Sequence, residues 1–249
     1  MIFMKNNGIE LLKHLYQINS KSGNEVEIKR FVLDQLRSLT LTVEEDEIGN
    51  IFVTKGVAGK YPCVAAHLDE VHLPCVRNII EEDGRIYALN ENGENVGIGA
   101  DDKNGVWVAL QLLKSLDVLK VVLFVQEEKA TYEGYQHGSD VCDLSFFDDV
   151  KYVLQCDRKG AGDLVTFCTK RELRLCNDDF IPQGILQKYG YAPVAGGVTD
   201  VVHLKERGLS RPCCNISCGY YNAHKPEEYA ELAELMNCLE FVKTIVQTL

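Results

Sequence analysis

The sequence predicts an α/β fold in which a single domain spans residues 1–249. Apolar residues recur at helical spacing near both ends of the chain, short apolar runs typical of buried strands lie between them, and strands and helices alternate. A length of 249 residues is at the upper end of what one domain commonly holds. Neither an internal repeat nor a linker rich in Pro, Gly or Ser divides the chain.

Two helices are expected at the start of the chain. The segment SKSGNE, residues 20–25, separates them and supplies a turn and a helix cap. The apolar residues that predict the two helices are Ile9, Leu11, Leu12 and Leu15 in the first, and Val26, Ile28, Phe31, Val32, Leu36 and Leu39 in the second.

The middle of the chain reads as strands around one buried helix. GNIFVTKG (49–56) and YPCVAAHL (61–68) are short β-branched or apolar runs bounded by Gly or Lys. Residues 121–125 and 151–157 are apolar runs typical of strands covered on both faces, and residues 103–116 form a helix that is apolar on most of its circumference. A long amphipathic helix from Pro226 to Leu249 is expected to close the domain, because proline and acidic residues are favoured in a first turn.

Composition limits the classes of partner. A formal net charge of -11 and a pI near 5.1 argue against nucleic acid, whose binding needs a basic surface. The first apolar run is too short for a signal peptide, and no run approaches the roughly 18 apolar residues of a membrane span. We therefore expect a cytoplasmic protein without a membrane partner. The sequence does not indicate an oligomeric state.

The ten cysteines are expected to be reduced. They are spread over a large chain that has no secretion signal, and none forms a C-x-x-C pair. Cys213, Cys214 and Cys218 lie in RPCCNISCG (211–219), which reads as a buried strand where cysteine acts as a small hydrophobic residue. A structural metal site at this cluster is the alternative.

Polar residues follow the predicted strands where each strand ends, or open the next helix. These positions are His67 and Asp69, Asp101 and Asp102, Glu127 and Glu128, and Asp157. Since ligands of α/β sheets bind outside the carboxyl ends of the strands, we expect the side chains to converge on one crevice. Imidazole and carboxylate groups together are typical ligands of Zn²⁺ or a similar divalent ion, which would also neutralise their negative charge. His224, in the loop before the last helix, supplies a second imidazole.

These segments resemble the dinuclear zinc exopeptidases, which include tripeptidase T, the carboxypeptidase G-like and acylase enzymes, and related aminopeptidases. AHLDEV, GIGADDKNG, VQEE, QCD, GGVTD and NAHKPEE occur in the superfamily's order between Tyr61 and Glu228. SKSGNEVEIKRFV also resembles the opening segment of the tripeptidase T branch. The resemblance implies a three-layer α-β-α sandwich around a mixed, mostly parallel sheet.

The resemblance also implies a role for each site residue. His67, Asp101 and Asp157 would hold one Zn²⁺, while Asp101, Glu128 and His224 would hold the other, with Asp101 bridging the two. Asp69 would accept a hydrogen bond from His67 and fix its tautomer. Glu127 would act as the general base and then as the general acid. Co²⁺ or Mn²⁺ would suit the same ligands.

Structural roles are the alternatives for these residues. His67 and Asp69 could form a strand-end pair, Asp101 and Asp102 could cap the buried helix, and Glu127 with Glu128 could be a solvated turn. Asp157 could pair with Arg158 or Lys159. Asp200 in GGVTD belongs either near the substrate pocket or to a tight turn. His14, His72, His137 and His203 match no ligand motif and are expected to be surface or packing residues.

The chain differs from the tripeptidase T-like and carboxypeptidase G-like enzymes in one respect. Only 38 residues lie between Asp157 and Gly196, where those enzymes insert a dimerising lid domain, so residues 158–190 are expected to continue the catalytic sheet with a strand or two and a helix. Our leading hypothesis is a zinc aminopeptidase or di/tripeptidase acting on short peptides. The alternatives are a metal-binding but inactive relic that serves as an interaction module, and a hydrolase of small N-acyl metabolites.

Overall fold

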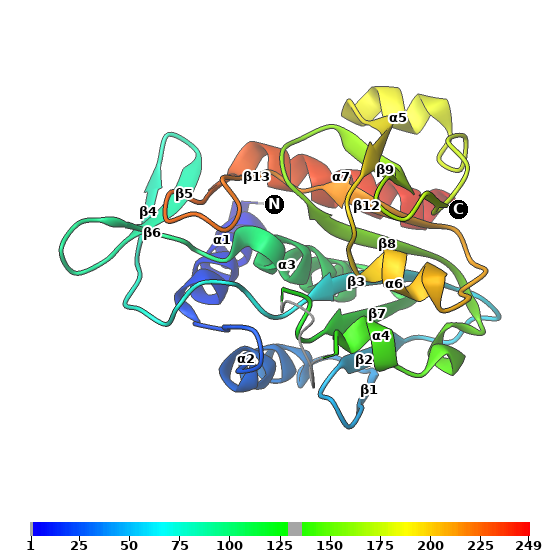
Figure 1. Ribbon diagram of the computed structural model, residues 1–249, viewed down its shortest axis with the longest axis horizontal. Helices are drawn as coiled ribbons and strands as arrows, with labels where there is room; N and C mark the ends of the chain where they lie inside the picture. Colours follow the sequence, from blue (N-terminus) through cyan, green and yellow to red (C-terminus); the bar gives the residue numbers. More distant parts are fainter. Residues whose placement is uncertain (1, 129–135) are drawn as a thin grey trace.

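The computed structural model describes residues 2–128 and 136–249, and it confirms the α/β class (Figure 1). The strands of its main sheet are β1 (Thr42–Glu45), β2 (Ile51–Lys55), β3 (Tyr61–His67), β7 (Leu119–Phe124), β8 (Val150–Arg158), β9 (Asp163–Cys168), β10 (Leu173–Arg174), β11 (Ala192–Gly196) and β12 (Cys213–Ser217). Their order is β1-β2-β7-β3-β8-β12-β9-β10, with β11 paired to β9. The central strands β7, β3, β8 and β12 are parallel, and β1, β2 and β10 pair antiparallel to their neighbours. The sheet is therefore mixed with a parallel centre.

Helices cover both faces of this sheet. One face carries α1 (Ile2–Gln17), α2 (Val26–Leu36), α3 (Ala100–Ser115), α5 (Gln183–Tyr189) and α7 (Leu232–Thr248), and the other carries α4 (Gly138–Val141), the 3-10 helix η1 (Leu144–Phe147) and α6 (Asp200–Glu206). This arrangement is the expected three-layer sandwich. None of the described helices combines the length and the apolar composition that crossing a membrane requires.

Strand β3 is apolar along most of its length because both of its faces are buried. Val64 and Ala66 are buried in the hydrophobic cluster shared with α1, α3 and α7, whereas Cys63 and Ala65 are buried in the cluster shared with α6. Successive side chains of a strand point to opposite faces, so a strand with helices on both sides buries every residue. All seven positions of β3 are buried, which carries His67 into the protein at the strand's carboxyl end.

A second, smaller sheet was not expected from the sequence. It contains β4 (Asn78–Glu82), β5 (Arg85–Leu89), β6 (Asn95–Val96), β13 (Tyr220–Tyr221) and β14 (Tyr229–Glu231). Asp83 and Gly84 have φ angles of 50° and 82° and join β4 to β5, as residues of a two-residue hairpin turn do. The Asp-Gly pair was thus an available hairpin signal. Figure 1 shows this sheet projecting beside α1 and α3.

The start of the closing helix was predicted wrongly. Helix α7 begins at Leu232 rather than Pro226, and residues 229–231 form β14. The Glu228 side chain is buried and accepts a hydrogen bond of 2.6 Å from the Gly99 main-chain N–H, and the Glu231 N–H donates to the Gly219 carbonyl at 2.7 Å. These contacts hold the segment extended against the loop before α3, so the helical pattern of the sequence is overridden there.

The other predicted elements agree with the structure. The two opening helices, the four central runs, the buried helix and the strand of RPCCNISCG are present as α1, α2, β2, β3, β7, β8, α3 and β12. Residues 158–190 add β9, β10 and α5, and β9 joins the main sheet. The ten cysteines are free thiols. Cys213 and Cys214 are buried in clusters on opposite faces of the sheet, so the metal-site alternative for that segment is not supported.

Candidate metal centre

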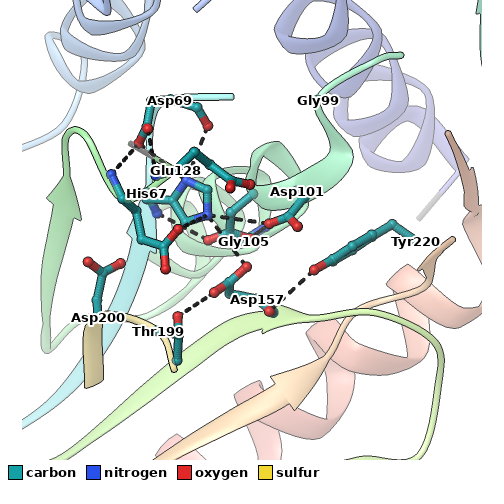
Figure 2. A network of polar contacts seen from close by, with 12 residues as sticks. His67, Asp69, Gly99, Asp101, Gly105, Glu128, Asp157, Thr199, Asp200 and Tyr220 are labelled. Atoms are coloured by element: carbon teal, nitrogen blue, oxygen red, sulfur yellow. Dashed lines mark hydrogen bonds and ion pairs between the residues drawn. The ribbon is translucent and has the colours of Figure 1, made fainter. Parts of the chain in front are cut away.

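The predicted site residues come together at the carboxyl edge of the parallel strands. His67 ends β3, Glu127 and Glu128 follow β7, and Asp157 lies near the end of β8. Asp101 lies at the entry to α3, where its φ and ψ of -82° and 101° are not helical. His224 arrives from the loop between β13 and β14. Figure 2 shows the side chains of His67, Asp101 and Asp157 facing a common space.

Asp101 lies between the two histidines. Its Oδ1 atom is 3.3 Å from His67 Nε2, and its Oδ2 atom is 3.3 Å from His224 Nε2. Each carboxylate oxygen therefore faces a different imidazole, as an aspartate that bridges two cations must. The helix-capping alternative applies to Asp102, whose carboxylate accepts hydrogen bonds from the main-chain N–H groups of Gly105 at 2.9 Å and His67 at 3.1 Å.

Each histidine has a further carboxylate beside it. Asp157 Oδ1 lies 3.5 Å from His67 Nε2, and Glu128 Oε1 lies 2.7 Å from His224 Nε2. Ligand atoms of Asp101, Glu128 and His224 lie within 4.8 Å of one another, as do those of the group His67, Asp102 and Asp157. The first group is the set that the resemblance implies for one ion. In the second, Asp102 takes the place expected for Asp101.

The chemistry of this donor set fits divalent cations. His67 Nε2 is buried and has no hydrogen-bond partner within the described residues, although three carboxylates surround it. Neutral imidazole and carboxylate are ligands of Zn²⁺ and similar ions. A bound cation would occupy the lone pair of this nitrogen and neutralise the carboxylates.

The close approach of these charged groups shifts the pKa values of several site residues. Hydrogen bonds to Asp101 and Glu128 raise the pKa of His224 to about 10. Burial and the neighbouring Asp101 raise the pKa of Asp157 to about 8, and burial raises the pKa of Glu127 well above its usual range. These shifts favour protonation of the crowded carboxylates, and a bound cation would neutralise the same negative charge.

Asp69 has a second role that sequence reasoning missed. Its carboxylate accepts hydrogen bonds of 2.9 Å from the main-chain N–H groups of both Glu127 and Glu128. The Nδ1 atom of His67 lies 3.1 Å from the Asp69 main-chain oxygen and 3.4 Å from its carboxylate. The hydrogen bond to His67 thus involves the Asp69 main-chain oxygen, while the carboxylate anchors the loop that carries the two glutamates.

A layer of polar residues positions Asp157. The Thr199 hydroxyl and the Gln155 side-chain amide donate to Asp157 Oδ2, and the Asn215 side chain accepts from the Asp157 main-chain N–H at 2.9 Å. Gln155 also donates to the buried carboxylate of Asp200 at 2.9 Å. The GGVTD segment thus supports the site rather than forming an isolated turn. Gln155 belongs to the QCD segment but was not singled out, and Asn215 carried no sequence signal, because single amides inside strands are common.

Glu228 is a further residue that sequence reasoning missed. Besides its bond from Gly99, it accepts a hydrogen bond of 3.3 Å from the Asp101 main-chain N–H and lies 3.0 Å from His72 Nε2. It therefore fixes the segment that presents Asp101. Its position four residues after His224, in NAHKPEE, was the available signal. His72, which was expected to be a surface or packing residue, is partly buried in this contact.

A cavity of about 290 Å³ opens onto the carboxylates. Asp101, Glu127, Glu128, Asp157 and His224 line it on one side. Val165, Val198, Tyr220 and Ala223 line its walls, and Arg158 and Lys159 lie at its rim. Arg158 pairs with Asp163 at 3.1 Å, so the alternative pairing of Arg158 with Asp157 is not observed. The cavity is of a size for a small polar substrate.

Comparisons with known proteins agree with this fold. No family model matches the chain. It is 29% identical over 115 residues to a candidate aminopeptidase of Acetivibrio thermocellus, covering 45% of this chain and 34% of that protein. It is 31% identical over 97 residues to a candidate [LysW]-lysine/[LysW]-ornithine hydrolase of Pyrococcus furiosus, covering 39% of this chain and 26% of that protein. The matches thus span about a third or less of these curated relatives.

The solved structure of aminopeptidase PepT from Bacillus cereus superposes with a TM-score of 0.81 and 15% identity, covering 96% of this chain and 97% of that one. The chain therefore has the same fold as this aminopeptidase. In α/β folds of this kind, ligands bind outside the carboxyl ends of the parallel strands, which is where the polar crevice lies.

Proposed function

Starting from a chain with the zinc exopeptidase fold, we propose that it is a metal-dependent exopeptidase that hydrolyses short peptides at a two-metal centre. The placement of Asp101 carries the proposal, because its two oxygens face His67 and His224 at 3.3 Å each. His67, Asp101 and Asp157 would hold one Zn²⁺, and Asp101, Glu128 and His224 would hold the other. Two such ions would polarise the peptide carbonyl and increase the acidity of the attacking water.

Glu127 is the proposed general base and acid. Its carboxylate lines the cavity, and its Oε2 atom lies 3.9 Å from His67 Nε2, so it is near both the proposed ligands and the substrate. Burial raises its pKa, which favours uptake of a proton from the attacking water. Glu127 would then deliver this proton to the amine that leaves when the peptide bond breaks. Asp69 holds the Glu127 main chain and so fixes where the carboxylate stands.

The test is turnover of a broad library of di- and tripeptides by the purified protein reconstituted with Zn²⁺. Glu127→Gln is the matched control, because it keeps the size of the side chain and removes the base. Cleavage by the wild-type chain that the control lacks supports the proposal. Two bound ions without turnover of any compound would instead support the inactive relic.

Hydrolysis of small N-acyl metabolites is the second candidate. The chemistry at the carbonyl would be the same. The similarity to a candidate [LysW]-lysine/[LysW]-ornithine hydrolase supports this second candidate function. A panel of N-acyl amino acids assayed beside the peptide library distinguishes the two. Activity confined to the acyl compounds would overturn the peptidase assignment.

A further inference from the structure

A second group of metal-ligating side chains lies where α4 packs against α6. His137 immediately precedes α4, Asp140 lies within α4, and His203 lies within α6. One ligand atom from each of the three lies within 4.8 Å of the other two. None of them lines the cavity at the candidate metal centre. The group is therefore separate from the proposed catalytic residues.

Within this group, the possible ligand atoms of the three side chains face one another. His203 Nδ1 lies 2.8 Å from Asp140 Oδ1, and the rings of His137 and His203 stack with their centroids 4.8 Å apart. His137 Nδ1 is buried and finds no hydrogen-bond partner in the part of the chain that the structure describes. A buried ring nitrogen without a partner is costly in a protein interior and is satisfied when it coordinates an ion.

The charge state of the group also suits a cation. An imidazole binds metal in its neutral form, and the Asp140 carboxylate beside His203 supplies a negative ligand. The charged groups facing it are Asp140, Glu206 and Arg171, and Arg171 is paired with Glu206 at 3.2 Å. The neighbouring Arg207 donates to the main-chain oxygens of α4, at Ser139 and Cys142. Asp140 thus remains the carboxylate available to an ion.

We propose that His137, Asp140 and His203 bind a divalent transition-metal ion, Zn²⁺ being the best match, at a structural site outside the catalytic crevice. Two imidazoles and one carboxylate are a common zinc donor set, and a water molecule would complete the coordination. The Asp140 side chain is 33% exposed, so the ion enters from solvent.

A metal ion at this site would link α4 to α6, the two helices that flank the crevice. Helix α4 follows the segment of Glu127 and Glu128, and α6 begins at Asp200 directly after Thr199, which contacts Asp157. An ion held by both helices ties these two parts of the wall together. The expected effect of the ion is on stability rather than on the chemical step.

The experiment is a zinc titration of four full-length variants beside the wild-type chain, with bound metal counted by elemental analysis. His67→Ala/His224→Ala removes proposed ligands of the crevice and should retain one equivalent. Adding His203→Ala to it should abolish that equivalent. His137→Gln alone should lose one equivalent relative to wild type while keeping its hydrolytic activity. His14→Ala, an exposed histidine, is the control and should lose none.

Each result decides the matter independently of the proposed function. The proposed structural site would be ruled out if His137→Gln bound as much metal as the wild type and the triple variant bound as much as His67→Ala/His224→Ala. The far-ultraviolet circular dichroism of every variant shows whether it is folded, and Asp140→Asn replaces any variant that is not. Zn²⁺ should also raise the unfolding midpoint of His67→Ala/His224→Ala, and this rise should vanish when His203→Ala is added.

Discussion

Asp69 accepts a hydrogen bond of 2.9 Å from the main-chain N–H of Glu128, which joins the end of β3 to the segment after β7. The same carboxylate accepts from Glu127 and lies 3.4 Å from the His67 ring. One buried side chain thus sets the relative positions of a proposed ligand on each metal and of the proposed base. Residues with this role determine how well a metal site is organised.

Asp69→Asn should therefore impair the whole centre. Asparagine offers one acceptor oxygen where the structure uses two, so one of the two N–H groups loses its partner. We expect metal affinity and kcat/KM to fall by roughly 10–100-fold. Asp143→Asn, which removes an exposed carboxylate that does not line the cavity, is the control. Wild-type metal affinity in Asp69→Asn would contradict the anchoring role.

Glu127→Gln should separate catalysis from metal binding. Glutamine cannot accept the proton of the attacking water, so kcat should fall by roughly 10²–10⁴-fold. Glu127 is not a proposed ligand, so the metal content should stay at the wild-type value. Steady-state kinetics and elemental analysis of the same samples check both statements. A Glu127→Gln protein as active as the wild type would eliminate Glu127 as the base.

Lys159 should recognise the carboxylate of a peptide substrate. It is exposed at the cavity rim and has no ion-pair partner among residues 2–128 and 136–249, whereas Arg158 beside it is paired. Lys159→Ala should lower kcat/KM for peptides with a free C-terminus by roughly 10-fold or more, the effect of one charge-assisted hydrogen bond. Peptides with an amidated C-terminus should be unaffected. The control is Lys60→Ala. Lys60 is exposed and immediately precedes β3, at the end of that strand away from His67. Equal losses on both kinds of peptide would exclude this role.

Glu70 should make stability depend on acid pH. Burial alone would raise its pKa, but Lys103 and Arg77 hold the pKa below its ordinary value of 4.5. A carboxyl with a lowered folded-state pKa stabilises the protein above its unfolded-state pKa, and this contribution is lost as the pH falls through the folded value. Both Glu70 and Arg77 are almost fully buried, so Glu70→Gln should cost about 3–5 kcal/mol at pH 7.

Denaturant unfolding at a series of pH values measures this effect. The difference in unfolding free energy between wild type and Glu70→Gln should shrink below pH 4.5. Glu10→Gln, whose side chain is 62% exposed and paired with Lys13, should differ from wild type by about 0–1 kcal/mol at most. A difference for Glu70→Gln that stays constant down to pH 2 would contradict the assigned ion pairs.

The sequence predicted those parts of the molecule whose pattern is local. Strands such as β3 are apolar because both faces are covered. Helix α3 is apolar around its circumference because it packs against the sheet on one side and against α1 and α7 on the other, so the sequence pattern was sufficient. The start of α7 could not be predicted this way, because a contact between Glu228 and Gly99 across the chain overrides the helical pattern. The small sheet was missed because its strands are short and partly exposed, although the Asp83-Gly84 turn indicated a hairpin.

The proposed ligands could be named from the sequence, because they lie at strand ends and in ordered motifs. Their supports were not named, since the roles of Gln155, Asn215 and Glu228 depend on contacts between distant segments. The role of Asp69 was identified only in part, because its bonds to Glu127 and Glu128 depend on β3 and β7 being neighbours. The three residues His137, Asp140 and His203 are a similar case, since only the packing of α4 on α6 brings them together.

The most direct test of the two-metal centre is the metal content of the zinc-reconstituted, dialysed chain beside that of His67→Ala/His224→Ala. The account predicts that the double variant binds two equivalents fewer per chain than the wild type, because each substituted histidine is a ligand of a different ion. An unchanged metal content, or a wild-type chain that binds no metal when Zn²⁺ is plentiful, would contradict it.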